Sequence, residues 1–213
     1  MSASYAKPDL FDQIRPLVDQ FRVLGEIDST NDEARRMIMS GFTGSNLIIA
    51  NTQSCGRGRR GRKWVSPAGG IYMSLTLPLN ESLIQPQALS LVSAISVKQS
   101  LESWSQVPIK LKWPNDLLVE GKKLAGILLE LQTSESMDHI VFGVGINYSL
   151  TNAQKERIDR EVTDVKELTE KLPVREEIVL SICTNLIENS RRFFNEGFDP
   201  FERIWNASDY YLG

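Results

Sequence analysis

The chain has 213 residues, of which 41% are hydrophobic and 24% charged, a balance that allows one large domain with a substantial core. A formal net charge of −3 and a single histidine argue against a protein that binds polyanions with its whole surface and against a histidine-rich metal centre. The two cysteines, Cys55 and Cys183, are far apart in the sequence and indicate neither a disulfide framework nor a zinc site.

The N-terminal part predicts two helices separated by a strand. Apolar residues at helical spacing indicate a short amphipathic helix over residues 8–20, and a strand is expected over residues 21–27. Thr30 and Glu33 have the spacing of a capping box, so a second helix should begin there with Thr30 as its cap. Gly41 is the residue expected to end this helix.

Strands dominate the middle of the chain, and mostly helical sequence follows them. Glu120-Gly121-Lys122 is a tight hairpin signal between two of the strands. Because strands and helices do not alternate strictly, the pattern predicts an α+β fold, a mixed and mainly antiparallel sheet backed by helices on one side. The expected elements are strands over residues 46–53 and 71–77, the second closed by Pro78, a helix over 86–104, strands over 109–113, 116–119, 123–132 and 140–147, and a helix over 175–195.

An arginine-glycine segment, G-R-G-R-R-G-R-K-W over residues 56–64, follows the strand expected at 46–53. Its G-x-G-x-x-G spacing matches the dinucleotide-binding fingerprint, but that fingerprint must open a helix, which Pro67, Gly69 and Gly70 prevent here. The glycines allow a ligand to approach the backbone, and the arginines supply charge and planar donors for phosphate. Taken alone, the segment is also typical of a solvated basic turn or an RNA-binding segment.

Three further motifs lie in the strand-rich part. Asn115 and Asp116, in K-W-P-N-D-L, fall at a break between strands, where they either hold a magnesium-bound nucleotide or form an ordinary turn. In K-L-A-G-I-L, strand alternation puts Lys123 and Gly126 on opposite faces, and Gly126 suggests a close approach to the backbone. Asn147 ends an apolar strand in G-x-G-I-N, and either caps the strand or enters a site.

Together these motifs resemble those of the biotin protein ligases. Ser29-Thr30-Asn31, Gln53, the arginine-glycine segment, K-W-P-N-D-L, K-L-A-G-I-L and G-x-G-I-N occur in the order and approximate spacing of that family, over about residues 21–212. The resemblance implies the biotin–lipoate ligase catalytic fold, which is like that of class II aminoacyl-tRNA synthetases. It also implies an activity: biotin and ATP with Mg²⁺ form biotinyl-5′-AMP, and the biotinyl group passes to a lysine of a biotin carboxyl carrier protein.

The resemblance also implies roles for individual residues. Lys123 is expected to be the catalytic lysine that offsets the repulsion between the biotin carboxylate and the ATP α-phosphate, and Arg59 is expected to retain the reactive intermediate. Asp116 is the expected magnesium ligand. The remaining expectations are biotin contacts from Ser29, Thr30, Asn31, Gln53, Gly56, Arg57, Gly58, Arg59, Lys123 and Gly126, and ATP or adenylate contacts from Arg57, Arg59, Trp64, Lys112, Asn115 and Asn147.

Partners and location are expectations of the same kind. No DNA-binding region precedes the first strand, so a non-repressor enzyme is expected, either a monomer or a homodimer, with no tightly bound prosthetic group. The family's C-terminal SH3-like domain is absent or truncated, which leaves residues 1–213 as one catalytic domain. The chain shows no signal peptide and no membrane-length apolar run, which indicates the cytoplasm and no membrane association. Two alternatives remain open, a lipoate–protein ligase and a non-catalytic biotin-binding protein.

Overall fold

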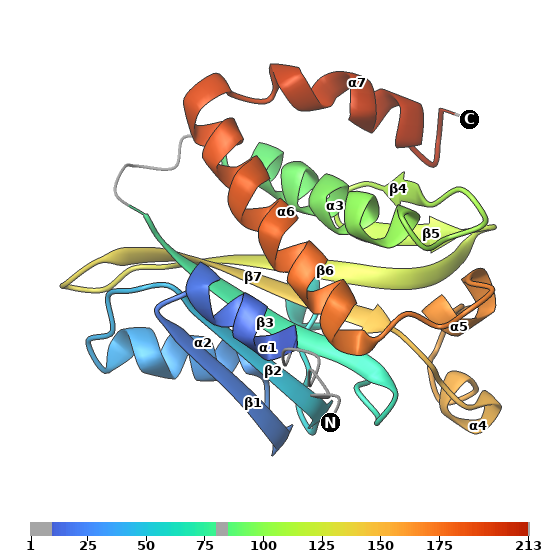
Figure 1. Cartoon of the computed structure of the whole chain (residues 1–213), viewed down its shortest axis with the longest axis horizontal. Coiled ribbons are helices and arrows are strands. Elements are labelled where there is room, and N and C mark those ends of the chain that lie inside the picture. The colour runs from blue at the N-terminus through green and yellow to red at the C-terminus, as the bar shows by residue number, and fades with distance from the viewer. Residues whose placement is uncertain (1–9, 80–84, 213) are drawn as a thin grey trace, which may run out of the picture.

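The computed structural model describes residues 10–79 and 85–212, which fold around a seven-stranded mixed sheet (Figure 1). The strand order is β1-β2-β3-β7-β6-β5-β4; β1 and β2 are parallel, and the other neighbours are antiparallel. The expected α+β class and mainly antiparallel sheet are therefore confirmed. The strands are β1 (Gln20–Ile27), β2 (Asn46–Gln53), β3 (Gly70–Leu79), β4 (Lys110–Lys112), β5 (Asp116–Val119), β6 (Lys122–Gln132) and β7 (Asp138–Asn147).

Helices cover both faces of the sheet, so the expectation of helices on one side was wrong. Leu47 and Ile49 of β2 belong to the large core with α3 and α6, whereas Ile48 between them packs with Ala34 and Ile38 of α2. Since successive strand side chains alternate between faces, β2 is buried on both, which explains its continuous apolar run. The helices are α1 (Leu10–Ile14), α2 (Thr30–Met39), α3 (Pro86–Glu102), α4 (Asn152–Lys155), α5 (Val165–Leu168), α6 (Arg175–Glu196) and α7 (Asp199–Ser208), with 3-10 turns at Arg15–Leu17 and Arg59–Gly61.

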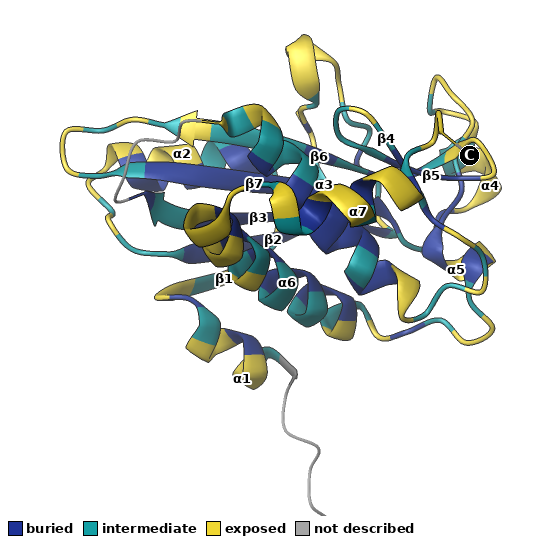
Figure 2. Ribbon diagram, turned by 90° about the horizontal axis from the view of Figure 1, so that it is seen from above, coloured by how far each residue is buried: buried dark blue, intermediate teal, exposed yellow. Residues whose placement is uncertain are grey.

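Burial follows this layered arrangement. Figure 2 shows the buried residues gathered in the sheet and on the helix faces turned toward it, with the exposed residues on outer helix surfaces and in loops. The long helix α6 packs beside α3 over the large core (Figure 1). In the part of the chain that the structure describes, no helix combines the length and the apolar character needed to cross a membrane.

The helix expected over residues 8–20 is shorter than predicted. Residues 8 and 9 lie outside the described residues; α1 ends at Ile14, a 3-10 turn follows, and β1 begins at Gln20. Pro16 explains the break. Its ring has no N–H to donate and would collide with the carbonyl four residues earlier in an α-helix.

The second helix is capped by Ser29 and not by Thr30. Ser29 Oγ accepts a hydrogen bond from the Asp32 backbone N–H at 3.4 Å. Thr30 is already inside α2, and its N–H and hydroxyl bind Gln53 Oε1 at 2.8 and 3.2 Å instead. Gly41 has a φ of +92°, the left-handed conformation expected of the residue that ends the helix.

Strand β3 continues through Pro78 instead of ending before it. Pro78 is paired with His139 of β7. On its other side β3 pairs with β2 only as far as Thr76, so among the described residues no strand pairs with Pro78 there and its missing N–H interrupts no ladder.

The hairpin predicted at Glu120-Gly121-Lys122 is present. Glu120 and Gly121 have φ angles of +50° and +80°, as in a two-residue turn, and they join β5 directly to β6. Asp116 at the start of β5 is thereby paired with Gly126 of β6. The hairpin thus places two of the sequence motifs side by side.

Candidate active site

The arginine-glycine loop, residues 56–64, is a short hairpin with a 3-10 turn at its tip. The Gly58 N–H donates to Arg62 O at 2.7 Å, and the Trp64 N–H donates to Gly56 O at 2.8 Å. After the loop the chain enters β3 and not an α-helix, so the rejection of the dinucleotide fingerprint is confirmed. The two hydrogen bonds hold the loop in a compact form above the sheet.

Gly56 lies at the base of the loop, where its two arms meet. A Cβ at this position would lie 2.5 Å from both Ser66 Oγ and Trp64 O, and 3.0 Å from Gln53 Nε2. Any side chain here would separate the arms, so the glycine serves their close packing. It is not among the residues that line the cavity described below.

The loop faces a part of the sheet that is built from glycines. Gly126 of β6 is paired with Gly145 of β7, and Gly143 precedes Gly145 on the same face. A Cβ on Gly145 would lie 2.5 Å from the Trp64 ring, and a Cβ on Gly126 would lie 3.0 Å from it. A Cβ on Gly143 would overlap the side-chain amide of Asn31. The glycines therefore leave room for Trp64 and Asn31 directly on the strands.

Lys123 projects into the same cavity as Gly126, although strict alternation predicted opposite faces. The pairing of β6 with β5 skips Leu124, because Leu117 pairs with Ala125 and the next residue of β5 pairs with Lys123. Leu124 is thus the extra residue of a β-bulge, and it and Ala125 are both fully buried. As a result, a Cβ on Gly126 would lie only 3.2 Å from Lys123 Cε.

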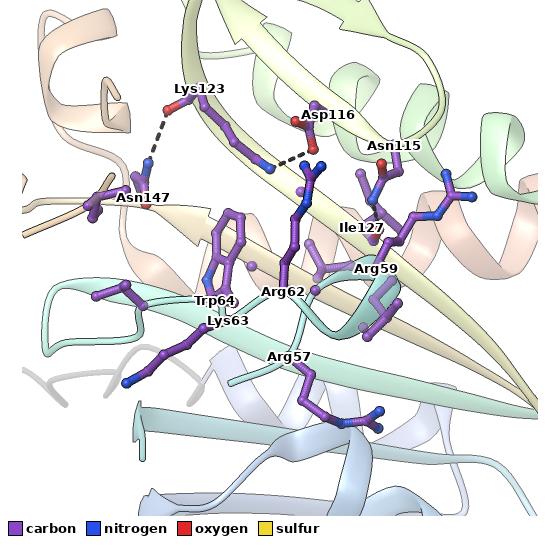
Figure 3. A pocket seen from close by; sticks show the side chains of 18 of the residues that line it. Arg57, Arg59, Arg62, Lys63, Trp64, Asn115, Asp116, Lys123, Ile127 and Asn147 are labelled. Atoms are coloured by element: carbon purple, nitrogen blue, oxygen red, sulfur yellow. Dashed lines mark hydrogen bonds and ion pairs between the residues drawn. The ribbon is translucent and has the colours of Figure 1, made fainter. Parts of the chain in front are cut away.

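The Lys123 ammonium is a largely buried charge on the cavity wall. Its Nζ is 2.6 Å from Asp116 Oδ1 and 4.9 Å from the Trp64 ring centroid (Figure 3). Arg160 Nη1 is 3.2 Å from the other Asp116 oxygen. Burial lowers the pKa of Lys123 more than Asp116 raises it, and Arg160 and Arg62 lower it further. An additional anion beside this lysine would stabilise its charged form.

Asn115 and Asn147 use their amide nitrogens to hold the backbone near Lys123. Asn115 Nδ2 donates to Ile127 O at 2.5 Å. Asn147 Nδ2 donates to Lys123 O and to Thr163 O, each at 3.1 Å. The two asparagines therefore fix the position of the strand that carries the lysine.

A second polar group lies where the start of α2 meets the end of β2. Gln53 Oε1 accepts from the Thr30 N–H at 2.8 Å, and Gln53 Nε2 donates to Ser66 Oγ at 2.9 Å. Ser74 Oγ lies 2.8 Å from Thr30 Oγ1 and 2.6 Å from Asn31 Oδ1. These donors and acceptors, together with Ser29 that caps α2, are what we call the polar end of the cavity. All of them except the half-buried Gln53 are buried, and they are preorganised for a small polar group.

The loop, the glycines, Lys123 and the polar end enclose one cavity of about 1020 Å³. Ligand pockets commonly span roughly 300–1,000 Å³, so this cavity is large. Lys112 is at its rim, with Nζ 5.4 Å from the Tyr210 ring centroid. Almost all residues assigned to the site from sequence line this cavity. They are Lys123, Gly126, Ser29, Thr30, Asn31, Gln53, Arg57, Gly58, Arg59, Trp64, Lys112, Asn115, Asp116 and Asn147.

The sequence analysis missed the segment after β7. Residues 157–160 line the cavity, and Arg160 contacts Asp116. Asp164, which is buried, anchors this segment through Lys155 at 2.9 Å. Arg157 and Arg160 are the only features of this segment that could have indicated a binding role from the sequence. Two charges without periodicity are also typical of a solvated turn.

Comparison with known proteins places these features in one family. The sequence model described as "Biotin/lipoate A/B protein ligase family" matches residues 24–147, which is more than half of the chain. The bifunctional ligase/repressor BirA of Bacillus spizizenii is 32% identical over 194 residues, which cover 88% of this chain and 58% of that protein. The biotin–[acetyl-CoA-carboxylase] ligase of Paracoccus denitrificans is 38% identical over 128 residues, covering 59% of this chain and 53% of that one.

A solved structure agrees with the sequence comparison. The biotin protein ligase of Aquifex aeolicus, in complex with biotin and ATP, superimposes with a TM-score of 0.79 at 34% identity. The match covers 91% of this chain and 80% of the Aquifex chain. The chain spans less than two thirds of the length of the two curated relatives, 58% of the BirA protein and 53% of the Paracoccus ligase.

Proposed function

The chain belongs to the biotin/lipoate A/B protein ligase family, and on this basis we propose that it is a biotin protein ligase. It activates biotin with ATP to biotinyl-5′-AMP and then transfers the biotinyl group to a lysine of a biotin carboxyl carrier protein. The observation that carries the proposal is the ion pair of Lys123 with Asp116, largely buried in a cavity that has an arginine-rich loop and a separate polar end.

In the first step, a carboxylate oxygen of biotin attacks the α-phosphorus of ATP. The bond from that phosphorus to the α,β-bridging oxygen breaks, and pyrophosphate leaves with the electron pair. Two anions must approach each other, and negative charge accumulates on the phosphoryl oxygens. Lys123 is the group we assign to this charge, because it is a preorganised ammonium, only 12% exposed, where solvent screens it little.

We assign the polar end to the ureido ring of biotin. A ureido group has two N–H donors and one carbonyl acceptor, and each one left unpaired when buried costs about 1–3 kcal/mol. Ser29, Thr30, Asn31 and Gln53 offer hydroxyl and amide partners that are already held by hydrogen bonds. Such a site selects a neutral polar head and leaves the carboxylate to extend toward Lys123.

The loop and the cavity rim are assigned to the adenylate. Arg59 extends from the loop toward Asn115 in Figure 3, and we assign it to the phosphate of the adenylate. Trp64, Lys112, Asn115 and Asn147 are the proposed contacts of the nucleotide, and Arg57 and Gly58 belong to the loop that covers it. In the second step the neutral amine of the carrier lysine attacks the biotinyl carbonyl carbon. The bond from that carbon to the phosphate oxygen breaks, AMP leaves with the electron pair, and the nitrogen loses a proton to solvent as the amide forms.

Magnesium would enter with ATP as part of the substrate. Among the described residues, no cluster of three or more histidine, cysteine or acidic side chains could hold a metal. Mg²⁺ bound to nucleotides needs only one or two protein carboxylates, because phosphates and waters fill the other positions. Asp116 is the proposed carboxylate, and its contacts with Lys123 and Arg160 would then be shared with the ion.

The test is to incubate the protein with ATP, Mg²⁺, a biotin carboxyl carrier domain and either biotin or lipoate, and to weigh the carrier by mass spectrometry. We expect a biotinyl adduct on one lysine and pyrophosphate release that requires both biotin and ATP. A lipoyl adduct instead would identify a lipoate–protein ligase. Biotin binding without pyrophosphate from folded protein would identify a non-catalytic biotin-binding protein.

A further inference from the structure

The Arg57 side chain does not extend toward Lys123. Figure 3 shows it pointing away from the other loop arginines. Its guanidinium makes a bidentate contact with Glu130 of β6, with both N–O distances 3.0 Å, and a third contact with Asp32 of α2 at 2.9 Å. The first arm of the loop is therefore fastened to the sheet and to a helix by a charged side chain.

Glu130 also contacts the polar end of the cavity. Its Oε2 accepts a hydrogen bond from Asn31 Nδ2 at 2.7 Å, and Asn31 Oδ1 lies 2.6 Å from Ser74 Oγ. Asn31 and Ser74 are both buried, whereas the Glu130 side chain is 20% exposed. One carboxylate thus joins a proposed ureido contact to the loop.

The second arm of the loop is connected to the polar end through Ser66 and Gln53. Ser66, just after the loop, contacts Trp64 O at 3.0 Å and accepts from Gln53 Nε2 at 2.9 Å, and Gln53 binds Thr30. Thr30 and Asn31 are adjacent at the start of α2. Both arms are therefore connected to one pair of neighbouring residues, so a ligand that orders this pair also orders the loop.

We propose that Glu130 is a positioning residue that couples occupancy of the polar end to closure of the arginine-glycine loop. This inference rests on the proposed function. When the ureido ring is bound, Asn31 is held in place, Asn31 holds Glu130, and Glu130 holds Arg57 with the loop closed over the adenylate. Arg57 acts here through its fastening to the sheet and not through the phosphate.

The charge of Arg57 is suited to this role. Burial lowers the pKa of Arg57, but Glu130 and Asp32 together raise it above its ordinary value, so the guanidinium stays charged throughout the working pH range. The two carboxylates come from different elements, so the contact holds only when α2 and β6 have their present arrangement.

The experiment follows the release of biotinyl-5′-AMP, formed on the enzyme from biotin and ATP, with biotin affinity and melting temperature measured in parallel. In Glu130→Gln the amide oxygen can still accept from Asn31, but the carboxylate that holds Arg57 is lost. We expect release to accelerate roughly ten- to a hundredfold, the value of charge-assisted hydrogen bonds, with a smaller change in biotin affinity. Glu130→Ala should weaken biotin binding as well, since Asn31 then loses its acceptor.

Two further comparisons separate coupling from damage to the fold. Arg57→Gln combined with Glu130→Gln should release the intermediate no faster than either single variant, because the two residues act as one contact. Asp32→Asn, which removes one of the three guanidinium contacts and leaves the two to Glu130, should accelerate release less than Glu130→Gln. Glu196→Gln is the matched control, since Glu196 pairs with Arg192 on the exposed side of α6 at 3.2 Å and should leave release unchanged.

The outcomes are distinct. Release from folded Glu130→Gln at the wild-type rate, or single-variant effects that add in the double variant, would overturn the coupling and leave the proposed function intact. If Glu130→Gln fails to fold, wild-type release from folded Arg57→Gln, which removes the other partner of the same contact, would overturn it equally. A wild-type protein that forms no biotinyl-5′-AMP from biotin and ATP would overturn the proposed function, and this inference with it.

Discussion

Lys123 Nζ lies 2.6 Å from Asp116 Oδ1, although the two residues are not paired in the sheet. The strand partner of Asp116 is Gly126, three positions beyond the lysine. The contact exists because the bulge at Leu124 turns the lysine to the face that carries Gly126, which has no side chain to block it. The ammonium that we assign to the phosphoryl charge is therefore placed by the backbone and held by one carboxylate.

Replacing Lys123 should remove the first chemical step and leave the fold intact. We expect Lys123→Ala to lower the rate of biotin-dependent pyrophosphate release by roughly a hundred- to thousandfold, as for loss of one preorganised electrostatic group. Biotin should still bind, because the polar end is unchanged. Lys122→Ala is the control, since this neighbour is exposed. Near-normal release by Lys123→Ala would disprove the assigned role.

The pH dependence of the reaction should report the same lysine. Since the folded pKa of Lys123 is lowered, the ammonium is lost, and activity falls, at a lower pH than for an exposed lysine. The unfolded chain binds this proton more tightly, so the contribution of Lys123 to the free energy of unfolding rises with pH between the two pKa values. Asp116→Asn removes the partner that raises the pKa, and should move the alkaline fall to still lower pH. A fall at unchanged pH in this variant would argue against Lys123 as the titrating group.

Arg59→Gly should loosen retention of the intermediate. We expect biotinyl-5′-AMP to leave faster and to modify lysines of bystander proteins, because the arginine is assigned to the phosphate. The measurement is the release rate, together with mass spectrometry of a bystander protein. Arg60→Gly is the comparison within the same loop, since Arg60 has a φ of +56°, which glycine adopts without strain. Equal effects of both variants would mean that only the total loop charge matters.

Gly145→Ala should displace Trp64 from the sheet. The added methyl would lie 2.5 Å from the indole, and overpacking of this kind costs about 1–3 kcal/mol in the free energy of unfolding. Nucleotide binding should weaken as well, which titration with ATP would measure. Gly25→Ala in β1 is the matched control, because nothing lies within 4 Å of a Cβ there. Similar losses in both variants would indicate a general effect of alanine in strands.

Asn147→Ala should impair catalysis more than the lost stability explains. It removes the amide that donates to the carbonyls of both Lys123 and Thr163, which should lower the free energy of unfolding by about 1–3 kcal/mol. The strand that carries Lys123 then loses one of its fixed contacts. Asn185→Ala removes one side-chain hydrogen bond to Ser100 between α6 and α3, away from the cavity. Thermal unfolding and pyrophosphate release should separate the two variants; parallel losses in both would assign Asn147 a purely structural part.

Much of the fold could be predicted from local patterns, because both faces of the central strands are buried and their apolar runs are unmistakable. The errors occurred where tertiary context decides. Pro78 predicts the end of a strand from sequence alone. Only the three-dimensional arrangement shows that β2 does not pair with β3 beyond Thr76, which allows β3 to continue through the proline. Thr30 has the residue type of a cap, but a long-range hydrogen bond to Gln53 places it inside the helix.

The site was predicted as a set of residues but not as a geometry. Motif resemblance found most of the cavity lining, whereas strand alternation misplaced Lys123 because a bulge leaves no mark in composition. Glu130 lies in an apolar run of β6, and nothing local indicates that it contacts Arg57 and Asn31. Residues 157–160 carry no periodic pattern, and the contact of Arg160 with Asp116 is visible only in three dimensions.

The bulge at Leu124 also bears on how such a chain can change over time. Substitutions at Leu124 or Ala125 alter only packing in the core, and similar apolar residues should be accepted there. Losing or gaining one residue between Lys123 and Gly126 is different, since it reverses the face of the ammonium while every side chain keeps its chemistry. We therefore expect the length of this motif to tolerate less change than the identity of its two buried residues.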